Sequence, residues 1–246
     1  MKIGILATGH TRGELAAEHG EYWTMFERML GAAAPDFAFE TVAVVDGAPL
    51  PAPEACDGWL VTGSRHGVYD DLPWIEPLKA FLRAARAAGR PIIGVCFGHQ
   101  ILAEAFGGRA EKSDRGWGVG VHDYEVLHRP GWMADAPARI AFQALHQDQV
   151  TEAPEDATLL ARSGFCPVGM LAYGDPERPE AISIQLHPEF DAEVAGDILR
   201  ARRGAAIPPE ATDPALETIE RPVDAARFAA WVAHYLEAVG AASPAA

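Results

Sequence analysis

Short apolar runs and amphipathic helical patterns alternate along the first hundred residues of the chain. The apolar runs are rich in β-branched residues, which is typical of buried parallel strands, and the helical patterns repeat every three or four positions. This alternation predicts an α/β fold with an open, mostly parallel sheet flanked by helices. The predicted strands are 3–7, 37–45, 58–62 and 91–95, and the predicted helices are 20–33 and 74–88.

The pattern changes after a helix predicted at 99–106. Shorter apolar runs follow, joined by turns that contain proline or glycine, which is typical of antiparallel strands. We therefore expect an antiparallel strand region appended to the first sheet, and two helices near the end of the sequence. These strands are predicted at 118–127, 139–145, 157–163, 168–173 and 181–186, and these helices at 191–202 and 223–239.

We expect one domain over residues 1–246, because a chain of this length buries one good-sized core. The core would span about residues 1–203, and 223–239 would add a C-terminal helix. Between them, the segment 204–221 contains three prolines. Proline is poorly tolerated inside helices, so this segment is predicted to be a surface loop.

Two glycines bracket a cysteine where the predicted strand 91–95 ends, in Gly94-Val95-Cys96-Phe97-Gly98. This is the cysteine form of a nucleophile elbow, a strained strand-to-helix turn in which glycines avoid a clash. The helix that follows would point its N–H groups at the sulfur and favour the thiolate. Phe97 would donate its backbone N–H to an oxyanion. Taken alone, the motif fits a small buried core residue equally well.

A second motif, His187-Pro188-Glu189, follows the predicted strand 181–186 directly. A thiolate nucleophile needs a proton shuttle within hydrogen-bond reach, and that imidazole needs a carboxylate on its other nitrogen. His187 and Glu189 meet this need if their strand lies beside the elbow. By itself, such a tripeptide is more often a surface turn.

Together, the motif from Gly94 to Gln100 and the His-Pro-Glu motif about ninety residues later resemble the class I (triad) glutamine amidotransferase family. The resemblance covers about residues 1–203 and implies a flavodoxin-like fold. It also implies a reaction: Cys96 attacks the side-chain amide carbon of glutamine, and ammonia leaves with a proton from His187. Water then releases glutamate from a γ-glutamyl thioester, while Glu189 holds the imidazole.

The same resemblance implies roles for four further positions. Gly63, within Thr62-Gly63-Ser64, and Phe97 would supply the two oxyanion N–H groups, and Gln100 would lie beside the bound γ-glutamyl group. The stretch 145–150 is similar to a His-x-Asp segment of the family, which makes His146 a candidate pocket-wall residue. An exposed turn histidine is an equally good interpretation of His146.

Three arginines lie in predicted loops that are candidates to face the mouth of the same site: Arg12, Arg65 and Arg115. Arginine binds carboxylates with two parallel hydrogen bonds, so these side chains are candidates to anchor a substrate carboxylate. The alternative is that each is a solvated loop charge.

Composition limits the class of ligand. The chain has 35 acidic and 20 basic residues and a formal net charge of −15, which argues against binding to nucleic acid or anionic membranes. Its three cysteines form neither a disulfide framework nor a zinc pattern. We therefore expect a cytoplasmic enzyme that acts on small molecules. We also expect no signal peptide, no membrane span, no cofactor and no metal ion.

The motifs look closer to stand-alone members of the family, including γ-glutamyl peptidases, than to members fused to a synthase. The first hypothesis is therefore a free-standing enzyme that hydrolyses the γ-glutamyl amide bond of glutamine or a γ-glutamyl compound. The second is a glutaminase subunit that supplies ammonia to a separately encoded synthase. The third is a catalytically silent binding protein with the same fold. The sequence predicts no oligomeric state.

Overall fold

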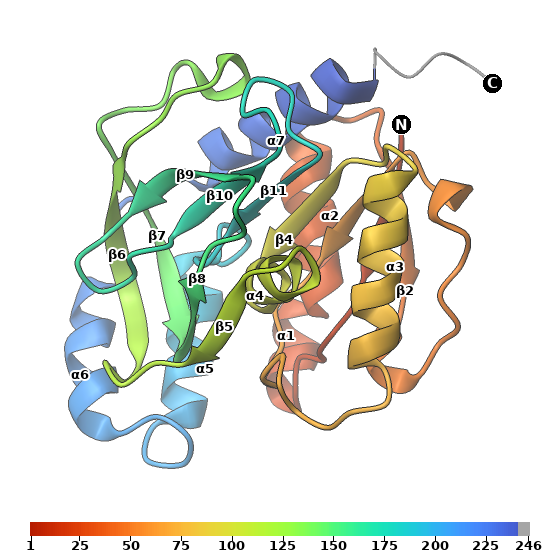
Figure 1. Ribbon diagram of the computed structural model, residues 1–246. Helices are drawn as coiled ribbons and strands as arrows, with labels where there is room; N and C mark the ends of the chain where they lie inside the picture. The colour runs from red at the N-terminus through yellow and green to blue at the C-terminus, as the bar shows by residue number, and fades with distance from the viewer. Residues whose placement is uncertain (241–246) are drawn as a thin grey trace.

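The computed structural model describes residues 1–240 and places a nine-stranded sheet at its centre, with helices packed around it (Figure 1). The strand order is β2-β1-β3-β4-β11-β10-β9-β6-β7, and a separate two-stranded sheet pairs β5 with β8. The bounds of the first five strands in this order are β2 (Ala38–Val42), β1 (Lys2–Leu6), β3 (Gly58–Val61), β4 (Ile92–Val95) and β11 (Ala181–Ile184).

These five strands run parallel to one another, which confirms the predicted mostly parallel sheet. Within it β3, β4 and β11 are direct neighbours, and Gly94 of β4 pairs with Val61 on one side and Ser183 on the other. The carboxyl ends of these strands therefore meet at one edge of the sheet. This edge is where ligands bind in open α/β folds.

The rest of the large sheet is antiparallel, as the shorter apolar runs predict. Two short strands, β5 and β8, were not expected from the sequence. Three of the four residues of β5 are exposed, so this strand lacks the apolar pattern that marks the others. The remaining strands are β10 (Met170–Tyr173), β9 (Ala157–Arg162), β6 (Gly118–Val126), β7 (Arg139–His146), β5 (Arg109–Lys112) and β8 (Asp148–Glu152).

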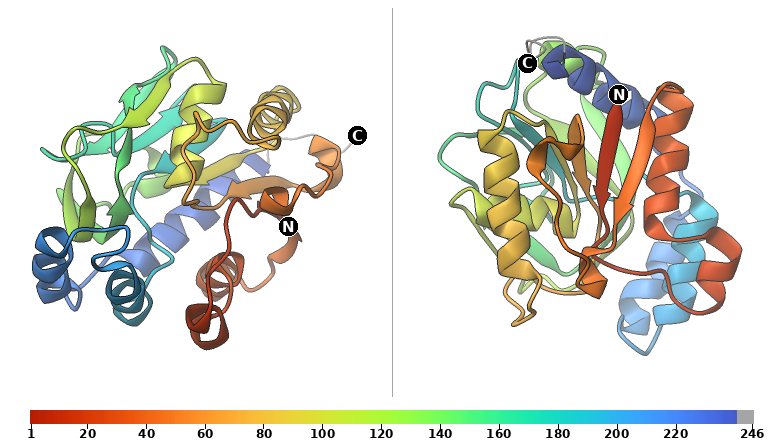
Figure 2. Two further views of the ribbon diagram at one scale, coloured as in Figure 1. Left: turned by 90° about the horizontal axis from the view of Figure 1, so that it is seen from below. Right: turned by 90° about the vertical axis from the view of Figure 1, so that its right-hand side faces the viewer.

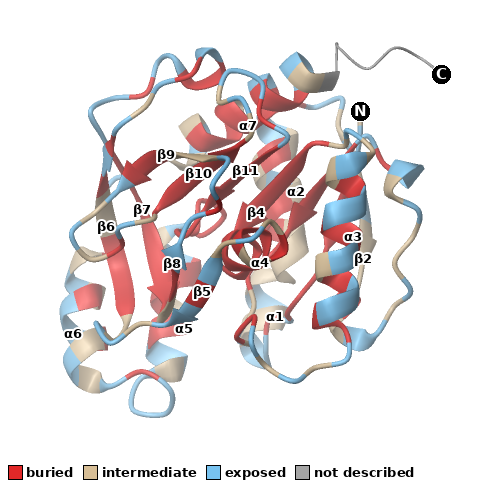
Figure 3. Ribbon diagram, viewed as in Figure 1, coloured by how far each residue is buried: buried red, intermediate tan, exposed pale blue. Residues whose placement is uncertain are grey.

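Helices cover both faces of the parallel strands (Figure 2, right). Helices α2 (Tyr22–Ala33) and α7 (Ala225–Gly240) pack on one face, and α3 (Ile75–Ala87) and α4 (Phe97–Ala105) pack on the other. The buried strands lie between the two layers (Figure 3). Two further helices, α1 (Glu14–His19) and α5 (Ala192–Arg202), lie near the carboxyl edge (Figure 1). None of the helices within residues 1–240 is long and apolar enough to cross a membrane.

The prediction of a surface loop over 204–221 is wrong, because the structure contains a further helix, α6 (Pro209–Thr218). Pro209 stands at the first position of the helix, where its missing N–H needs no acceptor. Ala215 is buried, and Gly120 of β6 leaves room for it, since a Cβ at Gly120 would lie 3.0 Å from Ala215. Packing on β6 thus outweighs the cost of Pro214 inside the helix.

Replacing Gly98 with alanine is expected to destabilise the fold by at least about 2 kcal/mol. A Cβ at Gly98 would lie 2.3 Å from the Val61 carbonyl oxygen, and backbone of a central strand cannot move aside. The matched control is Gly31→Ala, where the new Cβ would meet only Phe39 at 3.8 Å. This control is expected to be neutral or stabilising by up to about 1 kcal/mol. Urea unfolding of both variants measures the difference, and equal stabilities would contradict the prediction.

Candidate active site

Cys96 occupies a strained turn between β4 and α4. Its φ is 54° and its ψ is −102°, and no other non-glycine residue within 1–240 has a positive φ. Steric contacts require glycine at the flanking positions, because a Cβ at Gly94 would lie 2.4 Å from the Gly98 carbonyl oxygen. The sulfur belongs to a side chain that is 5% exposed, at the N-terminus of α4. Strain of this kind is typical of a functional position.

His187 and Glu189 form a buried pair just beyond β11. The imidazole Nδ1 lies 2.6 Å from the Glu189 carboxylate oxygen Oε1, and the ring stacks on Phe190 with centroids 4.3 Å apart. The other ring nitrogen, Nε2, is buried and has no hydrogen-bond partner among the described residues. Burial lowers the pKa of His187, but the charges of Glu189 and Cys96 outweigh this and raise it to about 10.

Gly63 lies between the cysteine and the histidine. A Cβ at this position would lie 3.0 Å from His187 Cε1 and 3.7 Å from Cys96 Cβ, so these residues meet at the ends of β3, β4 and β11. The backbone N–H groups of Gly63 and Phe97 donate no hydrogen bond within the described part of the chain. A thiol, an imidazole, a carboxylate and two free N–H donors are a set suited to acyl transfer.

Gln100 and His146 share one hydrogen-bond partner, the Asp148 carbonyl oxygen. The Gln100 amide donates hydrogen bonds to the Asp148 carbonyl oxygen at 2.9 Å and to the Gln185 side chain at 3.1 Å. His146 is buried, which lowers its pKa to about 3, and its Nδ1 is bonded to the Asp148 carbonyl oxygen at 3.2 Å. Its Nε2 has no partner within residues 1–240. His146 is thus a neutral wall residue with one free nitrogen, and the alternative of an exposed turn histidine is wrong.

Two adjoining cavities open on these residues. The inner cavity has a volume of about 190 Å³ and is lined by His187, Glu189 and Phe190 together with Tyr22 and Arg202. The outer cleft has a volume of about 1060 Å³, and its lining includes Cys96, Gln100 and His146. Both are also lined by residues of the loops after β1 and β3. The residues shared by the two cavities are Arg12, Tyr22, Ser64, Arg65, His66, Leu145 and Arg202.

The arginine predictions have mixed outcomes. Arg12 and Arg65 line both cavities. Arg115 lines neither of them and instead donates hydrogen bonds to the carbonyl oxygens of Gly164 and Phe165, so its proposed place at the mouth is wrong. Arg202, at the end of α5, was missed, because a basic residue in the last turn of a helix is ordinary in sequence. Phe190 was also missed, although it directly follows the His-Pro-Glu motif.

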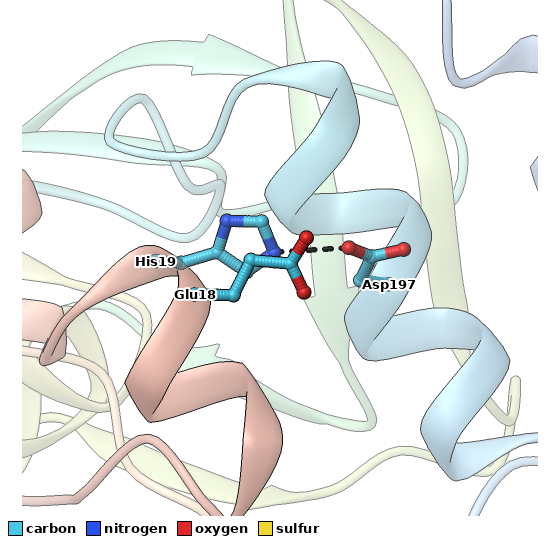
Figure 4. A group of neighbouring side chains, drawn as sticks. All are labelled: Glu18, His19 and Asp197. Atoms are coloured by element: carbon cyan, nitrogen blue, oxygen red, sulfur yellow. Dashed lines mark hydrogen bonds and ion pairs between the residues drawn. The ribbon is translucent and has the colours of Figure 1, made fainter.

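One group of side chains has the composition of a metal site: Glu18, His19 and Asp197 (Figure 4). Their ligand atoms lie within 4.8 Å of one another, and Glu18 and Asp197 line the outer cleft. His19 Nε2 lies 2.9 Å from Asp197 Oδ2, and this hydrogen bond joins α1 to α5. Since the contact satisfies both partners without an ion, we interpret the group as a packing contact between two helices.

The chain is similar to several known proteins. The family model "Glutamine amidotransferase class-I" matches residues 44–202. Gamma-glutamyl peptidase 3 of Arabidopsis thaliana is 31% identical over 210 residues, which are 82% of this chain and 77% of that protein. A glutamine-hydrolyzing GMP synthase subunit of Methanopyrus kandleri is 34% identical over 116 residues, 45% of this chain and 58% of that one. A crystal structure of a glutamine amidotransferase from Thermotoga maritima superimposes with a TM-score of 0.76 at 20% identity, covering 97% and 98% of the two chains.

Proposed function

Because the chain belongs to the class I glutamine amidotransferase family, we propose that it hydrolyses γ-glutamyl amide bonds with Cys96 as nucleophile, His187 as proton shuttle and Glu189 as the residue that positions the imidazole. One observation carries the proposal. A buried His187–Glu189 pair, with Nδ1 and Oε1 2.6 Å apart, ends the strand next to the one that presents Cys96 in a strained turn. This order of thiol, imidazole and carboxylate is the arrangement that nucleophilic catalysis requires.

In the first step the Cys96 thiolate attacks the γ-carbonyl carbon of the substrate. The C–S bond forms, and the carbonyl electrons move to the oxygen, which becomes an oxyanion. The N–H groups of Gly63 and Phe97 are free to donate to this oxyanion, and one such donor typically contributes about 3 kcal/mol to transition-state stabilisation. The imidazolium of His187 then protonates the leaving nitrogen as the C–N bond breaks, and a γ-glutamyl thioester remains.

In the second step the neutral imidazole accepts a proton from water, whose oxygen attacks the thioester carbon. Glutamate leaves, and the Cys96 sulfur and the His187 imidazolium are restored. The Glu189 carboxylate supports both steps because its charge raises the pKa of the imidazole and its hydrogen bond fixes the ring. Stacking on Phe190 also fixes the ring.

Gamma-glutamyl peptidase 3 matches this chain along most of both sequences, which supports a free-standing hydrolase. The GMP synthase subunit of Methanopyrus kandleri matches less than half of this chain, and it supports the second candidate, an ammonia-supplying subunit of a separate synthase. The two are separated by measuring glutamate release from glutamine, γ-glutamyl peptides and γ-glutamyl amines. Faster turnover of peptides or amines than of glutamine supports the hydrolase. Release from glutamine alone supports the second candidate. No release from any compound would contradict the free-standing hydrolase.

Replacing Gly63 with alanine is expected to reduce kcat at least about tenfold while the fold remains. The new Cβ would lie 3.0 Å from His187 Cε1, so the imidazole must shift away from the position that the substrate nitrogen requires. Steady-state glutamate release measures the effect, and far-ultraviolet circular dichroism checks the fold. The Gly31→Ala variant serves again as the control, because Gly31 lines neither cavity. A kcat equal to that of the wild type would mean that Gly63 does not border the reacting groups.

A further inference from the structure

We propose that the inner cavity is a subsite for a carboxylate on the leaving group, bound by Arg202 together with Arg12 and Arg65. The preferred substrates are then γ-glutamyl amino acids or peptides, whose leaving group is anionic, over glutamine and γ-glutamyl amines. This inference rests on the proposed function and adds the recognition of the leaving group to it.

The placement of the reacting residues decides which part of the substrate enters the inner cavity. His187 gives its proton to the leaving nitrogen, and His187 lines the inner cavity but not the outer cleft. Cys96, Gln100 and His146 line the outer cleft but not the inner cavity. The γ-glutamyl group bonded to sulfur therefore lies on the outer side, and whatever is attached to the leaving nitrogen extends inward.

Arg12, Arg65 and Arg202 lie where the two cavities adjoin, since they line both, and they have no protein carboxylate in the described part of the chain to neutralise them. None of Arg12, Arg65 and Arg202 lies within 4.0 Å of a carboxylate oxygen among residues 1–240, and Arg202 donates only to the Tyr22 hydroxyl at 3.4 Å. Half of the other arginines within residues 1–240 form an ion pair with a carboxylate. Examples of such ion pairs are Arg203–Asp213, Arg221–Asp123 and Arg227–Asp135.

The other charged groups of the inner cavity do not offset these arginines. Glu189 is the one carboxylate in the lining, and it is bonded to His187. His10 also faces the cavity, and its hydrogen bond with Asp46 raises its pKa, although Asp46 stands outside the lining. His66 lies 3.4 Å from Asp70, which lines only the outer cleft. In a chain with a net charge of −15, this is a local concentration of positive charge.

Size and charge together select the leaving group. A volume of roughly 10–15 Å³ holds one water-sized molecule such as ammonia. The inner cavity, at about 190 Å³, therefore has far more room than the hydrolysis of glutamine needs. An amine that carries a second ammonium group would meet three guanidinium groups, which is repulsive. A carboxylate can accept paired hydrogen bonds from a guanidinium, the geometry for which arginine is suited.

The test compares two substrates of nearly the same shape, γ-glutamylglycine and γ-glutamylethylamide, which differ by a carboxylate in place of a methyl group. The wild type is expected to favour γ-glutamylglycine in kcat/KM at least about tenfold. Arg202→Gln is expected to lower this ratio at least about tenfold, and Arg202→Lys, which keeps the charge, is expected to lower it less. Arg28→Gln, on the exposed side of α2, is the matched control and is expected to retain the wild-type ratio.

A wild-type ratio near one, or a ratio that Arg202→Gln leaves unchanged in a folded protein, would overturn the subsite while hydrolysis itself stands. If Arg202→Gln unfolds, the double variant Arg12→Gln/Arg65→Gln provides the same comparison, because both side chains are exposed. Absence of Cys96-dependent release from both substrates would instead overturn the proposed function, and the subsite with it.

Discussion

Replacing Cys96 with alanine is expected to lower glutamate release from any γ-glutamyl substrate by at least about 10⁴-fold. Without the sulfur no thioester forms, and the remaining oxyanion donors and binding contacts provide only a small part of the acceleration. The fold should persist, because alanine fits wherever cysteine fits, although the strained φ of 54° remains. The measurement is steady-state turnover of the substrate that the wild type hydrolyses fastest.

The structure provides a control for this prediction in Cys56, which is buried beside α3 and lines neither cavity. Cys56→Ala is expected to retain activity within about threefold, since removing one buried sulfur costs only modest stability. Intact-mass analysis after treatment with a glutamine-like electrophile should show one adduct in the wild type and in Cys56→Ala, and none in Cys96→Ala. Residual turnover above about 1% in Cys96→Ala would show that another group is the nucleophile.

The sequence predicts the parallel sheet and the glycine-flanked turn that carries Cys96, because local sequence patterns determine both features. Gly94 and Gly98 are needed by backbone contacts within β4, α4 and β3, so the motif itself carries the constraint. The His-Pro-Glu motif likewise sits directly at the end of an apolar run. Once β11 is known to pair with β4, the proximity of His187 to Cys96 follows from the parallel order alone.

Features that depend on tertiary packing could not be predicted from the sequence. Helix α6 was missed because its stability comes from burial of residues such as Ala215 and Ile219 against the sheet, whereas its prolines favour a loop. Arg202 was missed for a related reason. Its helix ends beside Tyr22, which is 180 residues away in the chain, and no local pattern indicates that pairing. The inner cavity is therefore visible only when distant segments are brought together.

Replacing Glu189 with glutamine is expected to reduce kcat on the order of 10³-fold and to change the pH profile. In the free enzyme the charges of Glu189 and Cys96 raise the pKa of the imidazolium to about 10, so kcat/KM, which reports the free enzyme, should fall only as the pH rises through that value. The carboxylate charge raises this pKa, whereas a neutral amide cannot. The falling limb of the residual kcat/KM should therefore move to lower pH in Glu189→Gln, and its position is read from kcat/KM measured between about pH 6 and pH 10.5.

The matched control is Glu193→Gln, which removes an exposed carboxylate from the first turn of α5. Loss of a charge there costs less than about 1 kcal/mol of stability and leaves the imidazole unchanged. Both kcat and the pH at which kcat/KM falls should therefore stay at their wild-type values. A merely structural role for Glu189 would lower activity at every pH by the same factor. A falling limb that does not move in Glu189→Gln would therefore contradict the assignment of this carboxylate as the group that holds the imidazole protonated.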